Sequence, residues 1–91
     1  MFVEIGTEKI VKDEDILGMF DLDNASQTSA AKEFFRIAQK NGKVTMLGSE
    51  LPKTMIVMKN GDIYLSQYAQ KILTARAESL FRGVKNMLKN P

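Results

Sequence analysis

The side chains best placed to do chemistry in this sequence are lysines and arginines. Arg36, Lys40 and Lys43 surround the end of a predicted helix, and Lys53 follows a loop that begins at Gly48. Lys and Arg contacts to phosphate oxygens supply most of the sequence-independent affinity of proteins for DNA. We therefore interpret these four cations as candidate phosphate contacts, with solvated surface charge as the alternative.

The residues needed for catalysis or metal binding are missing. The 91-residue chain has no His and no Cys, so the commonest general base and the thiolate nucleophile are both absent. Gly42-Lys43 lacks the earlier glycine of a phosphate-binding loop, and the segment that begins at Asp21 has Ser26 where a calcium loop needs glycine. The acidic residues 13–15 point in diverging directions and are expected to form a solvated turn. The sequence predicts no enzyme, no cofactor and no metal site.

Charge is distributed unevenly along the chain. Residues 1–30 carry two lysines against seven carboxylates, whereas residues 31–91 carry eleven Lys and Arg against four carboxylates. Such a chain can present a basic face to phosphates, or pair head to tail with a copy of itself, or simply solvate both sets of charges. Without Cys, a membrane-length apolar run or a basic leader, the sequence indicates a cytoplasmic protein.

The N-terminal half is expected to form strands followed by a helix. Strands are predicted at 2–5, 9–11 and 16–22, with Gly18 as a candidate bulge. Ala31, Phe34, Phe35 and Ala38 then recur at helical spacing, and Asn41-Gly42 provides a left-handed end for that helix.

The second half opens with strands at 44–47, 54–58 and 63–66. Asn60-Gly61 predicts a tight hairpin between the last two, with positive φ at both central positions of a type I′ turn. Met55, Ile56, Val57 and Met58 are apolar without alternation, which favours a central strand covered on both faces. We expect a helix on one face and a second layer or second subunit on the other, with these four residues at an oligomer interface.

The chain is expected to end in a long amphipathic helix over 67–88. Its apolar stripe includes Leu80, Phe81 and Val84. We expect this stripe to pack on the sheet or on the same helix of a neighbouring subunit, and we assign these residues to the oligomer interface. An anionic membrane surface is the alternative. The whole chain is expected to be a single domain.

The order of these segments resembles the RemA/RemB family of extracellular-matrix regulators, and is closer to the RemB branch. The resemblance spans roughly residues 1–80 and is carried by the segments 2–6, 10–11, 15–21, 52–57, 63–66 and 73–77. The basic segment 81–91 lies outside it.

The expected segments predict an α+β fold, with an antiparallel sheet of about five strands, one internal helix and a long C-terminal helix. The resemblance implies that this architecture is similar to LytTR domains. It also implies homo-oligomeric rings, binding to double-stranded DNA, and transcriptional regulation of biofilm genes, and it allows a RemA-type paralogue as a further partner. In RemA-type members the loop that starts at the position of Gly48 carries arginines that contact DNA. Here that loop has Glu50 and only Lys53 as a cation, and Asp15 stands where a further arginine is expected. A non-DNA-binding oligomeric adaptor is therefore the alternative function.

Overall fold

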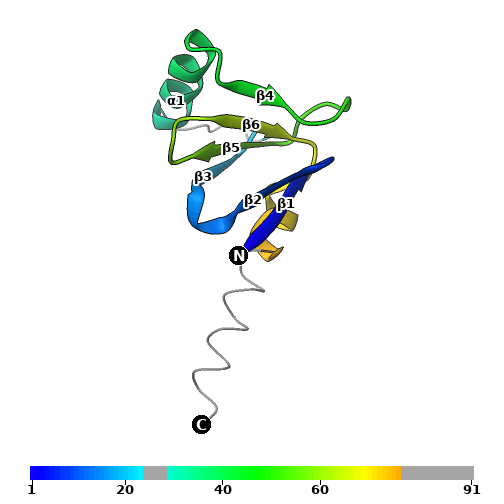
Figure 1. Ribbon diagram of the computed structural model, residues 1–91. Helices are drawn as coiled ribbons and strands as arrows, with labels where there is room; N and C mark the ends of the chain where they lie inside the picture. The colour runs from blue at the N-terminus through cyan, green and yellow to red at the C-terminus, as the bar shows by residue number, and fades with distance from the viewer. Residues whose placement is uncertain (24–28, 77–91) are drawn as a thin grey trace.

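The protein, described as a computed structural model over residues 1–23 and 29–76, has six strands in two sheets (Figure 1). The elements, in chain order, are β1 (Phe2–Gly6), β2 (Lys9–Lys12), a 3₁₀ turn (Asp13–Asp15), β3 (Ile16–Asp21), α1 (Ser29–Lys40), β4 (Val44–Met46), β5 (Thr54–Met58), β6 (Ile63–Ser66) and helical residues 70–76. β1 and β2 form an antiparallel hairpin, and the larger sheet has the order β3-β5-β6-β4.

The expected fold needs two corrections. The sheet is not a single antiparallel sheet of about five strands, because β4 pairs with β6 in parallel and the β1–β2 hairpin forms a sheet of its own. The prediction of a long C-terminal helix is also wrong, because the second helix is short. It begins at residue 70 and is described to residue 76. Residues 77–91 lie outside the described part of the chain.

Every residue of β5 is buried, because the strand is sandwiched between two apolar layers. Met55 and Val57 pack towards α1, in a cluster with Ala31, Ala38 and Ile63. Ile56 and Met58 face the other way, into a cluster completed by Val3, Ile5, Val11, Leu47 and Leu73. Figure 1 shows α1 on one side of the larger sheet and the β1–β2 hairpin, with the gold second helix, on the other. The second layer that the sequence required is therefore supplied by the same chain.

Specific contacts hold the hairpin against the sheet. The Ser66 hydroxyl, fully buried, donates a hydrogen bond to the carbonyl oxygen of Ile5 in β1. Gly6 lies so close to Leu47 that a Cβ at this position would come within 2.8 Å of the Leu47 Cβ. A side chain at Gly6 would therefore push the hairpin away from the sheet.

Local sequence signals account for three features of the backbone. The helix ends at Lys40 and is followed by Gly42 at φ 68°, as Asn41-Gly42 predicted. The β3–β5 register shifts between Ile16 and Gly18, which confirms the bulge. The hairpin at Asn60-Gly61 is present, but the prediction of a type I′ turn is wrong, because only Gly61 of these two residues has a positive φ, at 93°. The Gly61 N–H donates a hydrogen bond to the Met58 carbonyl oxygen at 3.0 Å. That geometry is a type I turn followed by a left-handed glycine.

The two-sided burial of β5 makes a prediction about stability. Ile56 is fully buried, so Ile56→Ala leaves a cavity and lowers the free energy of unfolding by about 2–5 kcal/mol. Leu51 is 84% exposed, and Leu51→Ala is the matched control, with an expected change within about 0.5 kcal/mol. Urea unfolding curves of the two variants measure the difference, and equal midpoints would contradict the sandwiched position of β5.

Candidate nucleic-acid interface

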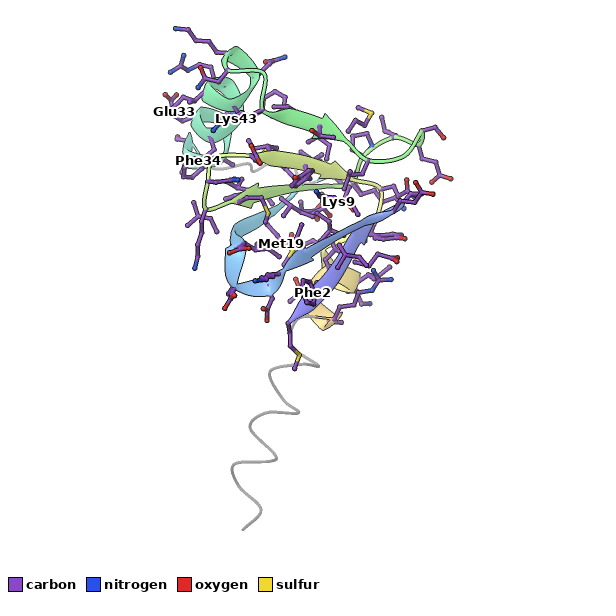
Figure 2. All side chains as sticks on the ribbon, in the orientation of Figure 1. Phe2, Lys9, Met19, Glu33, Phe34 and Lys43 are labelled. Carbon is purple, nitrogen blue, oxygen red and sulfur yellow. The ribbon has the colours of Figure 1, made fainter. Side chains whose placement is uncertain are left out.

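The basic face of α1 consists of Lys32, Arg36, Lys40 and the following Lys43. Lys32, Arg36 and Lys40 are four residues apart, so they form one stripe about 12 Å long on the helix surface. All four residues are exposed. The stripe lies away from Ala31 and Ala38, which bury the opposite side of the helix against the sheet. Figure 2 shows nitrogen-tipped side chains extending outward from α1, with Glu33 and Lys43 at the same end of the molecule.

Arg36 is held in place by Glu33, one helical turn earlier. Its Nη2 lies 2.6 Å from Glu33 Oε1 and its Nε lies 3.2 Å from Oε2, so the guanidinium grips the carboxylate with two parallel bonds. These hydrogen bonds, and then the charge of the guanidinium, lower the pKa of Glu33 from its ordinary value. Both side chains are exposed to solvent, which screens the pair, so its effect is on orientation more than on stability.

Lys43 is fixed by the β5–β6 hairpin. Its Nζ donates to the carbonyl oxygen of Asn60 at 3.2 Å, which draws the side chain across the hairpin tip. Lys59 lies on the same tip and adds a second cation. Two carboxylates are close by, because Asp15 and Asp62 line a cavity of about 260 Å³ together with Lys59. The surface is therefore basic over α1 and mixed in charge at the hairpin.

Lys53 does not join this surface. The Val44–Ile63 pairing places Lys43 level with Asp62, whereas the Thr54–Ser66 pairing places Lys53 level with Gln67. At about 3.3 Å per strand residue, the two lysines lie on the order of 16 Å apart along the sheet. The predicted set is thus divided: Arg36 and Lys40 share one face of α1 and Lys43 follows the end of that helix. Lys53 stands at the opposite end of the sheet, after the loop that contains the exposed Glu50.

The predicted oligomer-interface residues are placed differently from expectation. Met55, Ile56, Val57 and Met58 are all buried within one chain, so they have no surface to offer a second subunit. The unbroken apolar run is explained by cover from α1 and the hairpin. Leu80, Phe81 and Val84 lie outside the described residues.

Sequence reasoning missed two cations of this surface, Lys32 and Lys59. Lys32 carried a readable signal, because its spacing of four from Arg36 and of eight from Lys40 places it on the same helix face. Lys59 carried none, since its position depends on how the hairpin meets the end of α1.

Comparison with known proteins adds no identification. No protein-family model matches the sequence, and no curated protein matches it. Among residues 1–23 and 29–76, no cluster of acidic side chains could hold a metal ion. The described helices include none that is long and apolar enough to cross a membrane.

The Glu33–Arg36 contact makes a prediction about titration. In Arg36→Ala the pKa of Glu33 rises back towards about 4.5, because both the hydrogen bonds and the guanidinium charge are removed. Since the folded-state pKa is the lowered one, any stabilisation by the pair is present above pH 4.5 and is lost as the pH falls through the pKa of Glu33. A carboxyl-carbon NMR titration measures this, with Lys40→Ala as the control that keeps the pKa of Glu33 lowered; an unmoved midpoint in Arg36→Ala would refute the contact.

Proposed function

We propose that this protein is a cytoplasmic transcriptional regulator that binds duplex DNA through the basic face of α1 and acts as a homo-oligomer. The observation that carries this proposal is the alignment of Lys32, Arg36 and Lys40 on one exposed side of a helix. Three cations at regular intervals suit the regular negative charge of a phosphate backbone. The resemblance to the RemA/RemB family supports the assignment to extracellular-matrix genes.

The contacts expected from this face are electrostatic. Lys and Arg side chains that reach phosphates fix the position of a protein on the duplex and carry little sequence information. Binding should therefore be steeply salt-dependent and only weakly sequence-selective. Repetition of the face around an oligomer would raise the affinity, because the subunits bind one DNA segment together.

A gel-shift series tests which cations contact DNA. Lys40→Ala should weaken binding to a duplex and reduce the salt slope by about one for each phosphate that each bound subunit no longer neutralises. Lys53→Ala is the matched control, because it removes the same charge at the far end of the sheet. A larger decrease in affinity for Lys53→Ala than for Lys40→Ala would move the interface to the loop after Gly48 and contradict the proposal.

Glu33 offers a gain-of-binding variant in the same series. Glu33→Gln removes the carboxylate that occupies Arg36, so the guanidinium becomes available to a phosphate and affinity should rise. Glu50→Gln removes an equal charge from the distant loop and should have a smaller effect. An unchanged affinity in Glu33→Gln would show that Arg36 does not face the DNA.

A non-DNA-binding adaptor is the second candidate function. It is favoured by the carboxylates among the cations: Glu33 neutralises Arg36, and Asp15 and Asp62 lie beside Lys59. Absence of any shift with the wild-type protein at low salt would favour the adaptor over the DNA-binding regulator.

Self-association is proposed through two partly exposed apolar side chains of α1. Phe34 and Ile37 are 40% and 44% exposed. Phe34 lies about 120° or more around the helix from Arg36 and Lys40, so contact at Phe34 leaves the basic face free, whereas Ile37 borders that face at about 60° from Lys40. Sedimentation velocity at micromolar concentration should give a mass of several chains, and Phe34→Ser with Ile37→Ser should lower it. Leu51→Ser is the control, and a monomeric wild type would overturn this proposal.

A further inference from the structure

The outward side of the β1–β2 hairpin exposes two large apolar side chains. Phe2 is 68% exposed and Ile10 is 58% exposed, while Val3, Ile5 and Val11 point inward to the core. Phe2 is paired with Lys12 and Glu4 with Ile10, so these four side chains form the hairpin outer face. Phe2 and Ile10 are diagonal neighbours on it, about 7–8 Å apart. Figure 2 shows Phe2 on β1, beside the gold second helix.

Arg76, the last described residue, lies beside this face and is hydrogen-bonded to β1. Arg76 Nη1 donates to the carbonyl oxygen of Glu4 at 2.7 Å, and its guanidinium lies 4.7 Å from the centre of the Tyr68 ring. The Tyr68 hydroxyl donates to Glu4 Oε1 at 3.1 Å, which ties the same two elements together. The described part of the chain therefore ends at the edge of β1, next to the hairpin outer face.

The sequence that follows supplies apolar side chains that match the exposed apolar side chains of this face. Residues 77–91 contain five large apolar residues and three cations against one carboxylate: Leu80, Phe81, Val84, Met87, Leu88, Arg82, Lys85, Lys89 and Glu78. The first 15 residues, which form the hairpin and the 3₁₀ turn, hold five carboxylates against two lysines. The N-terminal 15 residues and the C-terminal segment have opposite net charges, which favours their approach, but the hairpin outer face itself holds one carboxylate and one cation, so the contact with it is mainly apolar.

The distances allow this contact within one chain. Ile10 lies opposite Glu4, about 5 Å across the strand pair. Leu80 and Phe81 follow Arg76 by four and five residues, which at about 3.3 Å per residue reach up to roughly 13–16 Å. Both side chains can therefore reach Ile10 and Phe2 without any change in the described fold.

We propose that residues 77–91 cover the hairpin outer face of their own chain, with Leu80 and Phe81 packed on Phe2 and Ile10. The driving force is removal of these apolar side chains from water. We assign this cover to the C-terminal segment of the same chain, because the segment follows Arg76 directly and Arg76 is hydrogen-bonded to β1 at the edge of this face.

A tryptophan reporter in the full-length chain tests the proposal, since the protein has no Trp of its own. Ile10→Trp should emit at a blue-shifted wavelength, because the indole is covered by the C-terminal segment. Adding Leu80→Ser and Phe81→Ser should shift the emission to that of an exposed indole. Adding Asn86→Ser and Asn90→Ser, which change only polar residues, should leave it blue-shifted. Leu51→Trp, in an exposed loop, should not respond to either pair of changes.

Other outcomes would overturn the proposal. An emission from Ile10→Trp that is already that of an exposed indole, or that ignores Leu80→Ser with Phe81→Ser, would mean that the segment does not cover this face. A blue shift that disappears on dilution would assign the cover to a second copy of the chain. A blue shift that arises only with vesicles containing anionic lipid would assign it to a membrane surface.

Discussion

The burial of β5 on both faces is the constraint on which the rest of this structure depends. Neighbouring strand residues point to opposite sides, so Met55 and Val57 need one apolar layer while Ile56 and Met58 need another. α1 supplies the first layer, and the β1–β2 hairpin with the second helix supplies the second. A chain of 91 residues buries only a limited apolar surface on folding, so both layers must form for the strand to be stable.

The hairpin layer is an integral part of this core. A two-stranded hairpin alone is at best marginally stable in water, and here it is held by burial of Val3, Ile5 and Val11. The two fully buried polar residues of the sheet are both satisfied across layers or elements. Ser66 donates to Ile5, and the Thr54 hydroxyl donates to the carbonyl oxygen of Tyr68 at 2.8 Å. These bonds fix the position of the hairpin and of the segment that leads to the second helix, because a buried hydroxyl without its partner is costly.

The layered arrangement also separates the charges. The acidic N-terminal segment builds the hairpin layer, and the basic face of α1 lies on the other side of the larger sheet. The charge asymmetry of the sequence is thus kept in part as an asymmetry between the β1–β2 layer and α1, with Asp15 of the N-terminal segment as an exception beside Lys59. This separation is what allows one face to be proposed as a phosphate contact and the other as the site covered by the basic C-terminal segment.

The sequence by itself determined the local elements: the α1 helix with its end at Asn41-Gly42, the bulge near Gly18, the hairpin at Asn60-Gly61, and β5 as a strand buried on both faces. These features are set by residue preferences and by periodicity within a few positions. Only the tertiary structure decided that β4 pairs with β6 in parallel, that the chain's own hairpin covers β5, and that Lys53 is separated from Lys40 and Lys43. Each of these depends on contacts between segments distant in sequence, whose geometry is selected by packing of the whole core rather than by local propensity.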